Sequence, residues 1–290
     1  MKDYLHIIVP TDLSSNGNLA FYHASEICKL FGGSMTPVYV LPKHESWYHK
    51  SNTVEFEKEK AAIEIEWKRL LSKISVSMAC TQCINEPQIL YGDVVEEILS
   101  VADDADLIVM TTKGRTGINR LMIGSVTRKV VNLSSKPVVV VDDTSEIAPM
   151  ERILVCTDLS EMSKVVFPYA ASFAKRTGCI LDLSYMIYTG PFQKKDTSEI
   201  VADSIKELEI IKKEYFGPIS KQVNVEALIT SVSIGEAITN LINSRKYQMV
   251  FISTLGSTNL KNLLVGSVAS AIIRLSDAAV FSINPRGDKI

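Results

Sequence analysis

The chain has 290 residues, of which 46% are hydrophobic and 22% charged, a composition that can bury a full globular core. Its formal net charge of −2 excludes the basic excess that is typical of a general nucleic-acid-binding protein. No apolar run approaches the roughly 20 residues that span a bilayer, the first residues show no signal-peptide pattern, and five cysteines do not suggest a disulfide framework. We therefore expect a cytoplasmic protein that contacts neither nucleic acid nor membrane.

In the first half of the chain, short apolar runs alternate with apolar residues at three- and four-residue spacing. The apolar runs predict strands at 5–9, 35–41, 84–90, 107–110 and 137–141. The wider spacing predicts helices at 19–31, 55–74, 94–102 and 126–133. Pro87 interrupts the third run, which is therefore predicted to be an edge strand.

The same order of elements returns after a short polar segment, 142–150, which we interpret as a linker. Residues 152–160 match residues 6–14, with Thr-Asp-Leu-Ser identical. Further strands and helices are then predicted at 164–176, 180–187, 201–215, 223–230, 235–243, 249–252 and 278–283. The repeat predicts two domains, 1–143 and 150–290, each within the common size range.

The clearest repeated motif lies between a strand and a helix in each half. Glycine, nine residues, then Gly-Ser occurs as Gly114…Gly124-Ser125 and as Gly256…Gly266-Ser267. A helix that begins after such a loop offers unpaired backbone N–H groups and a positive dipole end to an anion. The motif therefore predicts a phosphate site, unless the glycines only permit close packing of a strand–helix connection.

Strands that alternate with helices predict a parallel sheet with right-handed crossovers, covered on both faces. In such doubly wound sheets, ligands lie at the carboxyl ends of the strands where the winding direction reverses. Asp12 and Asp158 end the first strand of each half, so each should face one crevice together with the glycine loop. Their carboxylates could accept hydrogen bonds from a ligand or cap the following helix, and both roles are compatible.

Several enzyme signatures are absent from the sequence. There is neither a Gly-x4-Gly-Lys-(Ser/Thr) loop nor a Gly-x-Gly-x-x-Gly after the first strand, and spacing defines no nucleophile–base pair. Cys80-x2-Cys83 has no second pair nearby to complete a zinc site, so two reduced thiols are expected and no metal is predicted. A dedicated enzyme is not indicated.

These motifs resemble the universal stress protein family in its tandem two-domain form, over essentially the whole chain. The family motif, Gly-x2-Gly-x9-Gly-(Ser/Thr), matches in its last three elements, while Thr111 and Ser253 stand at its first glycine. The resemblance implies an α/β fold of two repeated five-stranded, doubly wound parallel-sheet domains of the adenine nucleotide alpha-hydrolase type. Since family members commonly dimerise through the last strand, 137–141 and 278–283 could pair within the chain as a pseudo-dimer, with or without further homodimerisation.

The resemblance also implies a stress-response protein that binds ATP or AMP, with or without Mg²⁺, and hydrolyses ATP slowly at most. An unidentified protein partner is expected as well. In the first half the implied contacts are Thr11, Asp12, Val40, Gly92, Thr111, Lys113, Gly114, Arg115, Gly124, Ser125, Val126 and Thr127. In the second half they are Asp158, Gly256, Gly266 and Ser267.

The first crevice is the expected main site. Its loop carries three basic residues, Lys113, Arg115 and Arg120, whereas the second loop carries only Lys261. A nucleotide-free interaction module is the alternative hypothesis, which Thr111 and its counterpart Ser253 favour.

Overall fold

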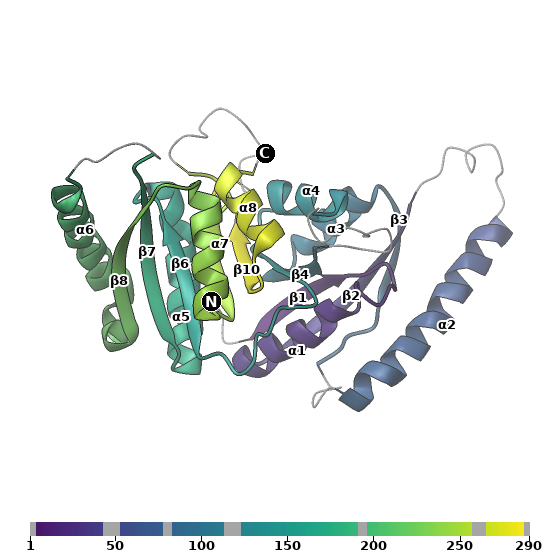
Figure 1. Cartoon of the computed structure of the whole chain (residues 1–290). Coiled ribbons are helices and arrows are strands. Elements are labelled where there is room, and N and C mark those ends of the chain that lie inside the picture. Colours follow the sequence, from purple (N-terminus) through teal and green to yellow (C-terminus); the bar gives the residue numbers. More distant parts are fainter. Residues whose placement is uncertain are drawn as a thin grey trace.

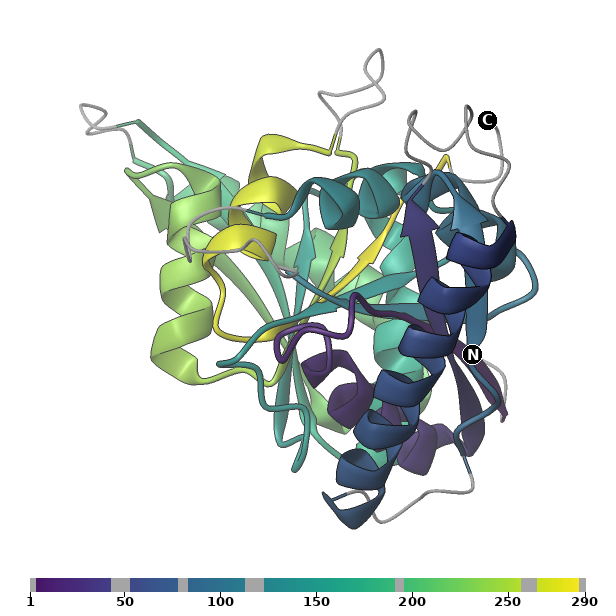
Figure 2. The ribbon, with the colours of Figure 1, turned by 90° about the vertical axis from the view of Figure 1, so that its right-hand side faces the viewer.

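A single ten-stranded sheet forms the centre of the computed structural model, which describes residues 4–42, 53–77, 83–112, 123–190, 196–256 and 265–286 (Figure 1). The strand order is β3-β2-β1-β4-β5-β10-β9-β6-β7-β8. Helices cover both faces of this sheet, and the turned view shows α2 running across the side of the first half (Figure 2). Among the described residues, no helix is both long enough and apolar enough to cross a bilayer.

The described part of the first half contains five strands and four helices, close to the predicted positions. The strands are β1 (Leu5–Pro10), β2 (Gly33–Pro42), β3 (Gln88–Gly92), β4 (Leu107–Thr111) and β5 (Val138–Val141). The helices are α1 (Leu19–Phe31), α2 (Thr53–Ser77), α3 (Val94–Ala102) and α4 (Ser125–Leu133). The strand predicted at 84–90 begins only after Pro87, because proline has no N–H to donate to the ladder. Before it, Ile84 forms an isolated bridge to Met35.

The second half repeats this order with one local difference. Its strands are β6 (Arg152–Thr157), β7 (Ile180–Tyr188), β8 (Val223–Thr230), β9 (Met249–Ser253) and β10 (Ala279–Ile283). Its α-helices are α5 (Phe167–Thr177), α6 (Ser198–Phe216), α7 (Ile234–Arg245) and α8 (Ser267–Leu275), with 3₁₀ helices η2 (Glu161–Val166) and η3 (Gly217–Gln222). The helix predicted at 164–176 therefore begins as the 3₁₀ helix η2. Pro168 then lies in the first turn of α5, where its missing N–H is tolerated.

Within each half all strand pairs are parallel, and the first strand lies between the second and the fourth. This arrangement is the predicted doubly wound α/β fold, with a change of winding direction between β1 and β4 and between β6 and β9. The two halves meet through an antiparallel pair, β5 with β10, in the register Val140–Val280 and Val139–Phe281. The pairing of the last strands within the chain is thus confirmed.

Two continuous hydrophobic cores cross the junction between the halves, one on each face of the sheet. The first lies under α1, α2, α5 and α6, and the second under α3, α4, α7 and α8. In the first core, the ring of Phe31 from α1 meets that of Phe173 from α5 edge to face, with centroids 4.7 Å apart. Residues 142–150, interpreted as a linker, also enter this core, since Ile147 and Met150 are only 1% and 8% exposed.

A buried polar cluster interrupts the second core near the amino ends of β6 and β7. The Asp182 carboxylate accepts hydrogen bonds from Arg152 at 2.7 Å, from Asn224 at 2.9 Å and from the Tyr247 hydroxyl. Burial by itself raises the pKa of Asp182, but these hydrogen bonds outweigh it and hold the pKa below its ordinary value. In the register of the first half Thr36 takes this place, so the ion pair belongs to one repeat only.

Candidate functional site

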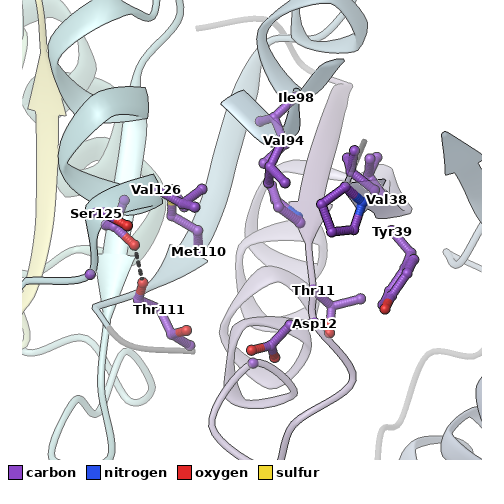
Figure 3. A pocket seen from close by; sticks show the side chains of 16 residues that line it. Thr11, Asp12, Val38, Tyr39, Val94, Ile98, Met110, Thr111, Ser125 and Val126 are labelled. Atoms are coloured by element: carbon purple, nitrogen blue, oxygen red, sulfur yellow. Dashed lines mark hydrogen bonds between the residues drawn. The ribbon is translucent and has the colours of Figure 1, made fainter. Parts of the chain in front are cut away.

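A cavity of about 330 Å³ lies at the carboxyl ends of β1, β2 and β4, where the winding direction changes (Figure 3). The first turns of α3 and α4 close it on one side. It is lined by Pro10, Thr11, Asp12, Gly17, Val38, Tyr39, Val40, Pro42, Val94, Ile98, Met110, Thr111, Gly124, Ser125, Val126 and Thr127. Eight of the residues that the sequence proposed for the first site therefore come together here: Thr11, Asp12, Val40, Thr111, Gly124, Ser125, Val126 and Thr127.

A strained turn holds Asp12 at the edge of this cavity. Leu13 adopts a left-handed backbone with φ of 61°, and its N–H donates to Thr11 Oγ1 at 2.9 Å. The Ser14 N–H donates to Asp12 Oδ1 at 3.0 Å. Leu159 repeats the conformation with φ of 63°, so both halves keep a backbone that is unfavourable for leucine. Asp12 therefore organises its own turn.

The second predicted role of the Asp12 carboxylate is to cap the following helix, α1. The N-cap of α1 is Asn18, and no side chain caps this helix. In the second half Asp158 Oδ1 accepts from the Ser160 N–H at 3.1 Å, which is the same local turn. Both aspartates are thus placed by strand ends and short turns, with their carboxylates at the crevice rather than on a helix end.

The N-terminus of α4 presents backbone amides to the cavity. Its N-cap Gly124 has φ of −56° and ψ of 146°, and among the described residues no side chain forms a capping hydrogen bond there. The amides of the next three residues, Ser125, Val126 and Thr127, have no acceptor within the helix, because the first turn lacks a preceding one. By contrast, Asp93 caps α3 and accepts from two of its amides at 2.9 and 3.1 Å. The first amides of α4 can therefore bind an anion, whereas those of α3 already donate to Asp93.

Thr111 is accommodated where the family motif has its first glycine. It is the last residue of β4, pairs with Val141 and is 8% exposed. Its carbonyl accepts a hydrogen bond from Thr127 Oγ1 at 2.8 Å, which ties the strand to α4 (Figure 3). The loop that follows is closed at its base by Gly124 N–H, which donates to Thr112 O at 2.7 Å.

The apolar wall of the cavity was not predicted apart from Val40. Val38 belongs to β2, Val94 and Ile98 to α3, and Met110 to β4. Figure 3 shows these side chains on the side of the cavity away from Asp12. An apolar residue at the carboxyl end of a predicted strand could have indicated them, but the same pattern marks ordinary core positions.

A second cavity of about 440 Å³ occupies the corresponding place in the second half. It brings together the four predicted residues of that half, Asp158, Gly256, Gly266 and Ser267, and also Met186. A Cβ on Gly256 would lie 2.7 Å from Asp158 Oδ2, so this glycine permits the close approach of loop and carboxylate. Neither cavity has a basic residue in its described lining.

Some proposed residues lie elsewhere. Gly92 ends β3, pairs with Pro42 and does not line the cavity; a Cβ there would lie 2.4 Å from Glu97 Oε1. Lys113, Gly114 and Arg115 lie outside the described residues. In the second half Ser233 caps α7 as Asp93 caps α3, accepting from the Glu236 N–H at 3.4 Å. Gly92-Asp93 of the first half is replaced by Val232-Ser233 in the second, so the helix cap is kept although the residues differ.

Within the part of the chain that the structure describes, no three His, Cys, Asp or Glu side chains are grouped to hold a metal ion. Cys83 is buried, while Cys80 lies outside the described residues. Cys156 lines the second cavity, and burial raises the pKa of its thiol to about 12. At neutral pH this thiol is protonated, the less reactive form.

The model of the Universal stress protein family matches residues 3–142 and again residues 150–283. The chain belongs to the universal stress protein family. A universal stress protein of Methanocaldococcus jannaschii is 32% identical over 148 residues, which are 48% of this chain and 82% of that protein. One from Mycolicibacterium smegmatis is 23% identical over 300 residues and matches 97% of both chains. Both comparisons agree with a tandem pair of universal stress protein domains.

The crystal structure of a universal stress protein from Archaeoglobus fulgidus shares the fold of the whole chain. It has a TM-score of 0.71 at 21% identity, and the match covers 97% of this chain and 98% of that chain. The resemblance to the family and the doubly wound fold inferred from the repeated motifs are thus both confirmed.

Proposed function

We propose that this universal stress protein binds an adenine nucleotide, ATP or AMP, chiefly in the cavity of its first half. The observation that carries the proposal is the uncapped N-terminus of α4, which lies across the cavity from Asp12. Amide donors with a positive dipole end suit phosphate groups, and a carboxylate suits ribose hydroxyls or an adenine amine. The cavity volume of about 330 Å³ also falls in the range of about 300–1,000 Å³ seen for small-molecule sites.

Each wall of the cavity then has a role in the proposed complex. The first turn of α4 from Ser125 would bind the phosphates, and Asp12 would orient the ribose. Val40 and Met110, with the apolar wall around them, would exclude water from the adenine ring. Lys113 and Arg115 are proposed to add charge to the phosphate side, as their loop position in the sequence suggests.

A nucleotide complex would also explain why the strained turns persist. Leu13 and Leu159 keep a left-handed backbone in both halves, and such strain commonly marks functional positions. Mg²⁺, if present, would be held mainly by the nucleotide's phosphates, since Asp12 is the single carboxylate in the described lining. No residue is proposed as a catalytic base. Any hydrolysis would therefore be slow.

Gly124→Asp should abolish ATP binding without unfolding the protein. The backbone of Gly124 suits other residues, and aspartate is a favoured N-cap, so α4 should gain about 0.3–1 kcal/mol. The new carboxylate would occupy the same amides and repel phosphate. Native protein at an ATP concentration of 100 times the Kd should gain about 2.7 kcal/mol, measured as a rise in melting temperature. The variant should show no rise.

Gly266→Asp is the matched control, because Gly266 caps α8 with φ of −57° and ψ of 152°. It should leave most of the ATP-dependent stabilisation intact if the first cavity is the main site. Gly124→Ala should retain binding, since it adds no charge. Native protein that shows no melting shift with millimolar ATP would contradict nucleotide binding and favour the interaction module.

We further propose that nucleotide occupancy changes what the protein presents to a partner. A ligand that binds only the folded crevice stabilises it, and the first turn of α4 belongs to that crevice. The alternative, a nucleotide-free module, is favoured by Thr111, whose side chain stands where the family motif keeps glycine. The two hypotheses differ in the ATP titration described above.

A further inference from the structure

A third cavity, of about 350 Å³, lies between α4 and α8, which run side by side at the junction of the two halves (Figures 1 and 2). It shares no lining residue with either crevice. It is lined by Ile123, Arg128, Lys129, Val131, Asn132, Val265, Ser270 and Ile273. Its volume lies near the lower end of the range of about 300–1,000 Å³ for small-molecule sites.

The charged residues of this cavity are cationic. Arg128 and Lys129 supply two positive charges, and the described part of the lining contains no carboxylate. Within the described residues, neither side chain forms an ion pair. The repeat does not require these charges, because the corresponding residues of α8 are Ser270 and Ala271. The helix dipole does not favour them either, since it favours cations in the last turn, and the last turn of α4 has none.

Half of the described lining is aliphatic. Ile123 and Val265, at the amino ends of the two helices, are partly exposed, whereas Val131 and Ile273 are only 2% and 3% exposed. Two cations and four branched aliphatic side chains in one lining match a ligand with an anionic group and a compact apolar body. An inorganic ion would satisfy only half of this lining.

We propose that a small organic phosphate binds between α4 and α8, with its phosphate on Arg128 and Lys129. The guanidinium fork of arginine can bind two phosphate oxygens, and the lysine ammonium adds a point charge. The apolar part of the ligand lies against Ile123 and Val265, the partly exposed aliphatic residues of the lining. This site does not depend on nucleotide binding in either crevice, although α4 lines both this cavity and the first crevice.

Calorimetric titration with 1-naphthyl phosphate tests the site, because this probe joins a phosphate to an apolar ring system. Native protein should bind it, and inorganic phosphate and 1-naphthol should each bind at least tenfold more weakly. Arg128→Gln combined with Lys129→Gln should weaken binding of the probe at least tenfold. Ser270→Glu should have a similar effect, since it places a carboxylate in the lining and leaves both cations in place.

The control removes two positive charges outside the lining. Arg274→Gln combined with Lys175→Gln changes exposed residues of α8 and α5 and should keep the affinity within twofold. Affinity within twofold of native in the Arg128/Lys129 variant would overturn the proposal, as would an equal loss in the control. Binding that survives this variant but is lost when Gly124 and Gly266 are both aspartate would place the probe in the crevices. Failure of ATP to bind would leave the expected result unchanged.

Discussion

Phe173→Ala should lower the free energy of unfolding by about 3–5 kcal/mol, the usual cost of truncating a buried phenylalanine. Phe173 is fully buried. The centroid of its ring lies 4.7 Å from that of Phe31, 5.4 Å from that of Phe251 and 5.9 Å from that of Phe281. The first of these neighbours comes from the other half of the chain. The substitution should therefore open a cavity where the two halves share a core. Urea unfolding followed by circular dichroism measures the loss.

Phe216→Ala is the comparison, because Phe216 is equally buried but packs on Phe167 within the second half. Both variants should lose stability to a similar extent. Only Phe173→Ala should also speed hydrogen exchange in α1, since Phe31 loses its edge-to-face partner. A loss below about 1 kcal/mol for Phe173→Ala would contradict a core shared between the halves.

Asp182→Asn should destabilise the protein by about 3 kcal/mol at pH 7, because removing one partner of a buried ion pair leaves a charge without compensation. The Asp182 side chain is 1% exposed, whereas the Arg152 side chain is 35% exposed. Water can therefore solvate the arginine in part, which places the expected loss at the lower end of the range for buried pairs. Urea unfolding at pH 7 measures it.

The loss should depend on pH in a defined direction. The folded-state pKa of Asp182 lies below its ordinary value, so its contribution is complete above the unfolded pKa of about 3.9. It is lost as the pH falls through the folded pKa. Native protein and variant should therefore differ most near neutrality and converge in acid below about pH 4.

Two control variants test whether the loss of stability comes from the buried ion pair of Asp182. Asp203→Asn breaks an exposed pair with Lys206, at 2.8 Å, and should have little effect. Arg152→His combined with Asp182→Thr installs the histidine–threonine pair of the first half, where His6 Nε2 and Thr36 Oγ1 lie 2.8 Å apart. This double variant should recover part of the loss. Native-like stability of Asp182→Asn would show that the cluster is not a coupled ion pair.

Most of the fold could be predicted because the duplication presents each local pattern twice. Thr-Asp-Leu-Ser placed Asp12 and Asp158 at strand ends, and Gly-Ser placed the starts of α4 and α8. Strand ends and helix starts depend on local sequence, so their meeting at one edge of a parallel sheet followed from the fold class.

Other features depend on contacts that local patterns do not encode. The left-handed backbone of Leu13 was not predicted, since leucine rarely adopts positive φ. Asp182 is 30 residues from Arg152 and 65 residues from Tyr247 along the chain, and the three meet only in the folded sheet. An aspartate within the apolar run of β7 was the one available signal, because a buried carboxylate needs partners. This aspartate indicates that the carboxylate has buried partners, but the sequence does not identify which residues they are.

The antiparallel pair of β5 and β10 has a consequence for how the two crevices can change in evolution. In a symmetric dimer of identical chains, every substitution alters both copies of a site, and dilution separates the partners. Here both partners of the junction belong to one polypeptide, so their encounter is intramolecular and does not depend on protein concentration. One crevice can therefore change its residues while the other stays as it is, and the pairing of the two halves persists.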